Sequence, residues 1–528
     1  MLRVRQIKTE VFSDTQENLL KAVSKKLKIE SRNIEKISVF KKSIDARNKN
    51  EIFYVYEVNV SVKDENAVLK KNKSADVFTA PDMGYKFIKT GTEQLNHNPI
   101  IVGAGPAGLF AAYILCENGY RPVIIERGED IDARMKTVED FWKYGKLDKN
   151  SNVQFGEGGA GTFSDGKLNT LVKDKDNRCR KVLETFVKFG APENILYEQK
   201  PHIGTDLLSK IIKNMRNEII SMGGTVMYNS CLTDIIESDG KLSAIVINGE
   251  KEIECDVLVL AVGHSARDTF SMLHSHGINM RSKPFAVGVR VQHNQDMINF
   301  SQYGAKYKDA LPPASYKLTY QAKDGRGVYT FCMCPGGYVV NASSENSRIA
   351  INGMSYNDRG GNNANSAVIV TVTPDDFGNN PLDGIEFQRC LEEKAYNAGC
   401  GKIPVQLLAD FKNGKTSDKY GDVKPSFKGE WSFADINSVL PEYICDALKE
   451  AFSDFGRKIK GFDSDDTILS AIESRTSSPV RIERDEDGIS SICGIYPCGE
   501  GAGYAGGITS AAMDGIRIAE KIGKRYKG

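Results

Sequence analysis

The first eighty residues carry a hydrophobic pattern that predicts a small α+β unit. Three segments alternate apolar and polar positions as half-buried strands do, and between the first two the apolar residues repeat at helical spacing. The strands are expected at residues 2–8, 37–43 and 52–62, the helix at residues 15–27, and a second helix from Asp64. This β-α-β-β order predicts a ferredoxin-like domain.

After a polar connector that ends at Pro99, the pattern becomes that of an α/β domain built on a parallel sheet. The expected elements are a strand at 100–102, a helix at 106–116, a strand at 122–125, an amphipathic helix at 206–221 and a meander of short strands at 225–259. A strand, a glycine-rich loop and a helix over residues 494–524 complete the same architecture. This order of elements is typical of a Rossmann-like domain.

Between these parts, from about Arg281 to Phe462, the pattern changes again, with strand-like runs at 286–291 and 367–372 followed by helical patterns around 387–396 and 444–455. We interpret this stretch as an inserted β-rich or α+β cap. The predicted division is residues 1–95, 96–280, 281–462 and 463–528, with the second and fourth ranges forming one domain.

Composition narrows the class of protein. With 40% hydrophobic and 26% charged residues among 528, disorder is excluded, and a net charge of +1 gives no whole-molecule attraction for nucleic acid. Eleven cysteines without a CxxC pair, and the lack of an apolar signal core after Met1, predict a reduced, cytoplasmic protein. The uncharged stretch 99–116 is long enough to span a membrane, but its glycines and prolines argue against a continuous helix. Cys332 and Cys334 lack a nearby histidine, so no metal site is expected.

Glycine is over-represented, with 49 residues where average usage gives about 37. The first glycine segment is VGAGPAG, which follows the strand at 100–102. Gly103 allows the tight turn, Gly105 lets the backbone approach a pyrophosphate, and Gly108 lets the helix pack on the strand. Glu126 ends the next strand, where a carboxylate can bind the ribose hydroxyls of an adenosine that has no 2′-phosphate.

Three further glycine segments predict a longer ligand, FAD rather than NAD alone. They are the loop VQFGEGGAGTFSDGKLN, the strand that ends at Gly263, and the C-terminal YPCGEGAGYAGGI. In the last of these, Glu500 can hold the ribityl hydroxyls. A helix that opens near Thr509 directs its positive end at the anionic edge of a reduced flavin.

Several motifs together resemble a known family, the bacterial NAD(P)/FAD-dependent oxidoreductases labelled FAD-dependent or NAD-utilising dehydrogenases. More distantly the sequence is similar to aminoacetone-oxidase-like flavoproteins and geranylgeranyl reductases of the glutathione-reductase superfamily. The motifs are KKSIDAR, GAGPAGLFAA, NVQFGEGGAGTFSDGKL, NGMSY, NNANSA, ESRTSSPVRI and YPCGEGAGYAGGI. The resemblance implies that Glu500 occupies the place of a ribityl-binding acid, commonly Asp, and that Leu232 lies near the adenine. It implies no substrate.

The predicted protein is therefore an α/β flavoenzyme with a Rossmann-like FAD-binding domain, an inserted cap and a small ferredoxin-like domain. We expect its FAD contacts at Gly103, Gly105, Pro106, Ala107, Gly108, Glu126, Arg127, Gly158, Gly159, Ala160, Gly161, Leu232, Val262, Gly263, Gly499, Glu500, Gly501, Gly506, Gly507 and Ile508.

The reaction predicted from these features is hydride transfer between flavin and a small organic substrate under the cap. Asp165 and Lys167 lie in the glycine loop, and Arg475 and Ser477 form an anion-binding cluster, although an arginine that ties the cap to the FAD domain fits equally well. There is no second strand-GxGxxG-helix unit for a dedicated NADPH domain, so NADH or NADPH, if it reduces the flavin, is expected to dock transiently. The direction of the reaction stays open.

A rival hypothesis concerns the basic N-terminal domain. Residues 1–80 hold 17 Lys and Arg against 11 Asp and Glu, and Phe53, Tyr54 and Tyr56 are candidate stacking platforms for RNA. The glycine and interleaved aromatics of an RNA-recognition motif are absent, and such a charge excess is usually a solvated face. Docking of a protein partner or a second subunit is a third role that stays open.

Overall fold

The N-terminal unit has the predicted ferredoxin-like fold in the computed structural model, which describes residues 1–528. Its sheet has the order β2-β3-β1-β4 with every neighbouring pair antiparallel. The elements are β1 (Leu2–Glu10), α1 (Gln16–Leu27), β2 (Ile34–Asp45), β3 (Phe53–Val62), α2 (Glu65–Lys71) and β4 (Val77–Thr79). Thr15 caps α1 by accepting a hydrogen bond from the Asn18 N–H. The apolar positions of the alternating strands form the core of the unit.

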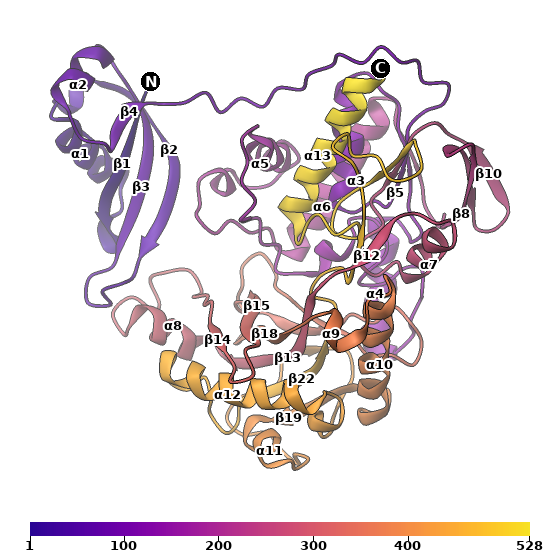
Figure 1. The fold of residues 1–528 in the computed structure, drawn as a ribbon. Coiled ribbons are helices and arrows are strands. Elements are labelled where there is room, and N and C mark those ends of the chain that lie inside the picture. Colours follow the sequence, from indigo (N-terminus) through magenta and orange to yellow (C-terminus); the bar gives the residue numbers. More distant parts are fainter.

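An extended connector, residues 80–99, runs from this unit across the top of the molecule to the Rossmann domain (Figure 1). It lies against the C-terminal helix α13 (Ile508–Arg525), where the N–H groups of Thr90 and Gly91 donate to the Gly523 carbonyl at 3.3 and 3.0 Å. The connector is therefore packed onto the domain that it reaches.

The Rossmann domain is centred on a five-stranded parallel sheet of order β24-β11-β5-β6-β7. Its strands are β5 (Ile100–Val102), β6 (Val123–Ile125), β7 (Thr225–Met227), β11 (Leu258–Leu260) and β24 (Ile495–Pro497). Its helices are α3 (Pro106–Glu117), α4 (Ile131–Tyr144), α5 (Arg178–Lys188), α6 (Thr205–Ser221), α7 (Arg267–Ser275) and α13. A separate meander holds β8 (Leu232–Ser238), β9 (Lys241–Ile247) and β10 (Lys251–Glu254).

The apolar stretch that begins at Pro99 forms β5 and then α3, with a glycine turn between them. Residues 107–116 of α3 are all buried, because one side of the helix packs against α13 and the other against the sheet. No helix of the structure combines the length and the apolar character that crossing a membrane requires.

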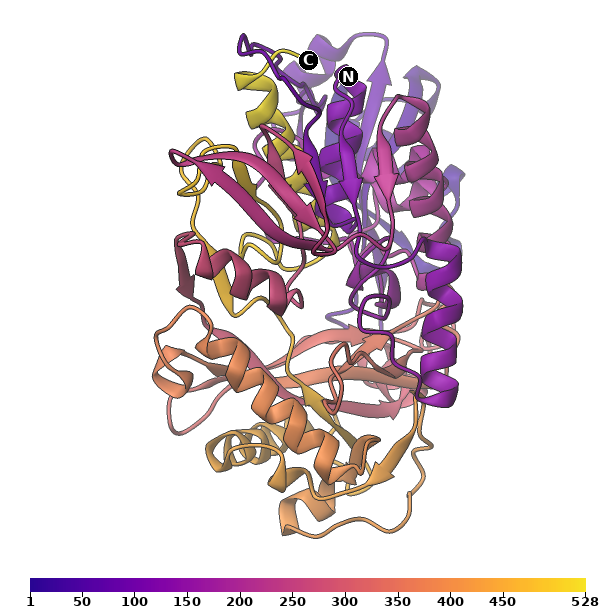
Figure 2. The same cartoon turned by 90° about the vertical axis from the view of Figure 1, so that its right-hand side faces the viewer.

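The cap is a mixed, mainly antiparallel sheet of order β14-β15-β18-β13-β22-β19-β21, covered by long helices at the base of the molecule (Figures 1 and 2). Its strands are β13 (Phe285–Asn294), β14 (Thr319–Gln321), β15 (Gly327–Cys334), β18 (Asn363–Val372), β19 (Ile403–Leu407), β21 (Trp431–Phe433) and β22 (Ile468–Glu473). A small second sheet holds β16 (Tyr338–Asn341), β17 (Ile351–Met354) and β20 (Phe427–Lys428). The helices are α8 (Gln295–Tyr303), α9 (Pro374–Phe377), α10 (Asp383–Ala398), α11 (Leu408–Asn413) and α12 (Glu442–Lys458).

The cap extends beyond residue 462, which the sequence analysis predicted as its last residue. β22 follows that position and pairs with both β13 and β19, in the middle of the cap sheet. The chain enters the cap through β12 (Met280–Ser282) and leaves it through β23 (Val480–Ile482), and these two strands form an antiparallel pair of their own. Both connections between the Rossmann domain and the cap thus lie side by side.

The ferredoxin-like domain contacts both other domains. The Lys42 N–H donates to the Tyr197 carbonyl at 2.6 Å, and the Gln199 N–H donates to the Lys42 carbonyl at 2.8 Å. Phe12 stacks on Tyr307 of the cap with ring centroids 5.3 Å apart. Tyr56, considered above as a stacking platform, is buried and donates its hydroxyl hydrogen to Asp14, so its ring cannot stack on a base.

Candidate functional site

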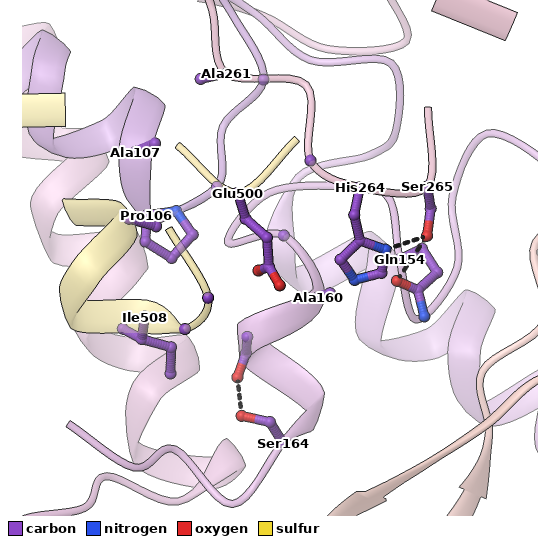
Figure 3. A pocket seen from close by; sticks show the side chains of 18 of the residues that line it. Pro106, Ala107, Gln154, Ala160, Ser164, Ala261, His264, Ser265, Glu500 and Ile508 are labelled. Atoms are coloured by element: carbon purple, nitrogen blue, oxygen red, sulfur yellow. Dashed lines mark hydrogen bonds between the residues drawn. The ribbon is translucent and has the colours of Figure 1, made fainter. Parts of the chain in front are cut away.

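A cavity of about 720 Å³ lies where the carboxyl ends of the parallel strands face the cap. Figure 3 shows the Glu500 carboxyl directed into this space between Pro106 and Ile508 on one side and His264 on the other. All four glycine segments contribute to its wall, as do residues of the cap strands. Segments separated by four hundred residues therefore meet around one space, at the strand edge where open α/β sheets bind ligands.

Of the twenty residues expected to contact the cofactor, sixteen line this cavity. The four that do not are Gly108, Gly158, Gly499 and Gly501, which lie behind the wall and allow its segments to pack. A Cβ on Gly108 would lie 1.9 Å from the Gly103 carbonyl oxygen, and one on Gly501 would lie 2.4 Å from that of Gly263. Close backbone packing accounts for glycine at these positions.

Gly105 differs from them, because its space opens on the cavity. A Cβ there would meet nothing closer than the Gly159 Cα at 3.8 Å, and its φ of −78° suits any residue. Packing in the protein therefore gives no reason for glycine at this position. Room left free beside a helix start is what close approach of a phosphate requires, so this part of the cavity fits a dinucleotide.

Two helices begin at the cavity wall. The first turn of α3 contributes Pro106 and Ala107, and the first turn of α13 contributes Ile508 and the residues that follow it. The N–H groups at a helix start lack intrahelical partners and carry partial positive charge. Two such ends facing one cavity suit a ligand with negative charge at two places, as FAD has in its pyrophosphate and in its reduced ring.

Glu126 ends β6 and is held by backbone donors. Its Oε2 accepts from the Ala104 N–H at 2.8 Å, and its Oε1 accepts from the N–H groups of Gly128 at 3.0 Å and Gly156 at 2.9 Å. A carboxylate offers about four acceptor sites, so one remains for a hydroxyl of the ligand. The carboxylate also ties the first glycine turn to the glycine loop.

Glu500 lies in the C-terminal glycine loop. Burial raises the pKa of its carboxyl to about 7, and the nearby Lys283 opposes this shift only in part. Burial in turn lowers the pKa of the Lys283 ammonium. An acid with its pKa near neutrality can donate or accept a hydrogen bond, so it suits a ligand rich in hydroxyl groups.

Asp165 and Lys167, predicted as catalytic residues, both line the cavity. The Lys167 Nζ lies 2.9 Å from the Asp165 Oδ2 and donates to the Met333 carbonyl. Arg359 of the cap also pairs with Asp165, through Nε at 3.1 Å. These cations hold the pKa of the buried Asp165 carboxyl below its usual value, in spite of its burial. The glycine loop is thus joined to the cap by charged groups at the cavity wall.

Arg475 lines the cavity too, but its guanidinium is occupied. Its Nε and Nη2 donate to the two oxygens of Glu392 in α10, each at 2.8 Å, and its Nη1 donates to the Ser344 hydroxyl at 2.6 Å. Arg267 of the Rossmann domain pairs with the same Glu392. These ion pairs agree with the alternative interpretation, in which Arg475 links the cap to the Rossmann domain. Ser477 does not line the cavity.

Two important features were missed at the level of sequence. The Arg134 side chain is fully buried in α4 and donates to five carbonyls of the glycine loop, those of Asn152, Val153, Gly156, Glu157 and Gly159. Nothing in an amphipathic helix marks one arginine as buried. Cys332 lines the cavity beside Lys167. A β-bulge interrupts the alternation of β15 at Cys332, so no local sequence pattern marks it.

Comparison with known proteins gives matches along most of the chain. Residues 101–170 match the family described as an NAD(P)-binding Rossmann-like domain, residues 284–476 the C-terminal domain-like family of FAD-dependent proteins, and residues 1–61 a domain of unknown function. The second of these ranges contains the cap sheet, including β22. An uncharacterized protein of Clostridium beijerinckii is 49% identical over 532 residues, which cover 99% of both chains.

Among solved structures, the chain is similar to an Escherichia coli quinol fumarate reductase subunit, with 13% identity and a TM-score of 0.37 over 82% of this chain and 70% of that one. It is also similar to the glycerol-3-phosphate dehydrogenase of Bacillus halodurans complexed with FAD, with 10% identity and a TM-score of 0.34 over 82% and 65%.

Proposed function

Because the chain belongs to the same family as its Clostridium beijerinckii relative, and its Rossmann and cap regions match dinucleotide-binding and FAD-dependent families, we propose that this FAD-dependent oxidoreductase transfers a hydride between flavin and a small organic substrate. One observation carries the proposal. The four glycine segments converge on a single cavity that continues to the cap. We assign its FAD domain to the glutathione-reductase type.

When bound, FAD supplies the two-electron chemistry, and the protein binds and orients it. The start of α3 and Gly105 would hold the pyrophosphate, Glu126 would accept a hydrogen bond from a ribose hydroxyl, and Leu232 would contact the adenine. Glu500 and the start of α13 would hold the ribityl chain and the flavin edge. Each of these groups lines the cavity.

At the other end of the cavity, Asp165 and Lys167 are the groups that we place beside the substrate. The cap strand β15 lies against them, because the Lys167 Nζ donates to the Met333 carbonyl, and the Asp165 carboxylate is buried. His264 is kept neutral, because burial and the charges of Arg475 and Arg267 lower its pKa to about 3. It therefore acts as a hydrogen-bonding group and adds no charge. Arg475 positions the cap through Glu392.

The hydride can be transferred in either of two directions. Either NADH or NADPH docks transiently and reduces the flavin, which then reduces an unsaturated bond, or the substrate is oxidised and a later acceptor takes the electrons. One range of the chain, residues 101–170, matches the NAD(P)-binding Rossmann-like family, and we assign it to FAD, so a nicotinamide donor has no matching domain of its own.

The test is anaerobic stopped-flow reduction of the FAD-loaded protein by NADH, by NADPH and by a panel of metabolites, followed through the visible absorbance of the flavin. Reduction by one nicotinamide identifies the donor, and reduction by a metabolite identifies the oxidative direction. A purified protein that shows no flavin absorbance even after reconstitution with FAD overturns the proposal.

A further inference from the structure

The cap strand β15 ends in two cysteines that the proposed hydride transfer does not use. Phe331 pairs with Ala367 and Cys334 pairs with Asn365, so two residues of β15 lie opposite the single residue between those partners on β18. This is a β-bulge, and Cys332 takes the left-handed conformation in it, with φ of 43°. The bulge draws the chain together, and the Cys334 Sγ lies 3.2 Å from the Cys332 carbonyl oxygen, to which it donates.

The two thiols differ in access. Cys332 lines the cavity, whereas Cys334 is completely buried behind it. None of the other nine cysteines lines the cavity, including Cys493 and Cys498, whose CxxxxC spacing is that of many redox pairs. An accessible thiol with a buried thiol next to it is the usual arrangement of a redox-active pair.

The surroundings of the pair carry more positive than negative charge. Arg290 is fully buried, and its Nη1 lies 3.1 Å from the Cys332 carbonyl oxygen and 3.8 Å from the Cys334 Sγ. Its charge is matched by Glu473, whose Oε2 lies 2.9 Å from the Arg290 Nε. Lys167, which donates to the carbonyl between the two cysteines, shares the single carboxylate of Asp165 with Arg359.

Three cations therefore face two carboxylates, while Glu500, which also faces Cys332, has Lys283 beside it, so that a thiolate at Cys332 would balance the charges. The pKa of Cys332 moves in that direction: the neighbouring Cys334 thiol, and then the charges of Lys167 and Arg290, lower it against the effect of burial. Burial raises the pKa of Cys334. These directions favour a thiolate at Cys332 beside a protonated Cys334.

We propose that Cys332 and Cys334 form a redox-active dithiol that exchanges two electrons with the flavin. The inference rests on the proposed function, because the flavin is the oxidant. The S–H bond of Cys334 breaks and one S–S bond forms, with release of two electrons and one proton. Oxidised flavin takes up both electrons and the proton, so that thiolate, thiol and flavin become disulfide and anionic reduced flavin. The reverse reaction places a dithiol at the substrate end of the cavity.

A short rearrangement is sufficient for the bond. Residues two apart on a regular strand have Cα atoms about 6.4–6.8 Å apart, at the upper limit of what a disulfide allows. Rotation of the Cys334 side chain away from the Cys332 carbonyl releases its sulfur for the bond. A disulfide closed over so few residues is expected to be easily reduced, as catalytic disulfides are.

The experiment counts electrons in the FAD-loaded protein. After mild oxidation and removal of the oxidant, anaerobic titration with dithionite should consume four electrons per flavin, two for the flavin and two for the disulfide. In Cys332→Ser, and separately in Cys334→Ala, the count should fall to two. Cys390→Ser, which changes an exposed cysteine of the cap, is the matched control and should keep four.

A second measurement follows the sulfur atoms directly. Trypsin cuts after Arg326 and Arg348 and releases a peptide, residues 327–348, that contains both cysteines of the pair and no other. From oxidised protein, trapped in acid, this peptide should be lighter by two hydrogen atoms. From protein reduced by dithionite it should carry two alkylated thiols.

The outcomes separate the two proposals. A protein that binds no FAD overturns the proposed function and this inference together. A protein that binds FAD but takes up only two electrons, with both thiols of the peptide free after oxidation, overturns this inference and leaves the proposed function standing.

Discussion

Replacement of Arg134 by methionine tests whether one buried cation holds the cofactor-binding loop. Its side chain is fully buried in α4, and its five hydrogen bonds to loop carbonyls range from 2.7 to 3.2 Å. No carboxylate pairs with it directly, and burial lowers its pKa to about 10. Methionine fills similar space but leaves the carbonyls of Asn152, Val153 and Glu157 without a donor, whereas those of Gly156 and Gly159 keep the N–H groups of Gly159 and Thr162.

The expected cost follows from those bonds. A buried acceptor left unpaired costs about 1–3 kcal/mol, and relaxation of the loop toward water recovers part of the total for the three carbonyls that lose their only donor. We therefore expect a net cost of about 3 kcal/mol, concentrated in the glycine loop. If FAD binding must restore the loop, the affinity falls about 100-fold, since each 1.4 kcal/mol is tenfold.

Titration of the apoprotein with FAD, followed by quenching of flavin fluorescence, measures this loss. Limited proteolysis should cut Arg134→Met within residues 152–166 before it cuts the wild type. Arg180→Met, which removes a surface pair with Glu184, is the control and should change stability by less than about 1 kcal/mol. Binding of FAD by Arg134→Met within threefold of the wild type would refute the reasoning.

Three further predictions concern single positions. Gly105→Ala should leave unfolding of the apoprotein within about 0.5 kcal/mol of the wild type, because the methyl group makes only an ordinary contact with the Gly159 Cα at 3.8 Å, but should weaken FAD binding at least about tenfold; thermal unfolding and FAD titration separate these effects. The folded-state pKa of Glu500, about 7, lies above its unfolded value, so the apoprotein should lose about 3 kcal/mol of stability as pH rises from 5 to 8. Urea unfolding should show this loss in the wild type and not in Glu500→Gln. Arg267 and Arg475 lower the pKa of Glu392, so its stabilisation is present above the unfolded pKa and is lost as pH falls. Glu392→Gln should cost about 3–5 kcal/mol at pH 7 and flatten the acid limb of the urea-unfolding curve; an unchanged acid limb would contradict the assignment.

Local patterns determined most of what the sequence could predict about the fold. The strand at 100–102 has the predicted bounds, and the helix expected at 106–116 differs by one residue from α3. These elements are short, strongly apolar and bounded by glycine and proline, so their period and their ends are both marked. The sequence analysis assigned β22 to the wrong domain, because a fully buried strand has the same apolar sequence pattern in either sheet.

For the candidate site, too, the sequence could predict only what a local pattern marks. Each glycine segment has a local signature, so the residues along most of the cavity wall could be predicted. Arg475 and Glu392 lie 83 residues apart, and no local pattern records that they pair. The thiol pair of β15 is equally invisible, because Lys167 and Arg290 reach it from two other segments of the fold.

The antiparallel pairing of β12 with β23 has a consequence for how such proteins diversify. Ser282 and Val480 are direct partners across this pair, so a turn of a few residues would join them and restore a continuous chain without the cap. A segment whose ends meet in this way can be lost, enlarged or exchanged for an unrelated one while the rest of the chain keeps its connectivity. Recombination at these two strands is thus a route by which one cofactor platform could acquire new substrates.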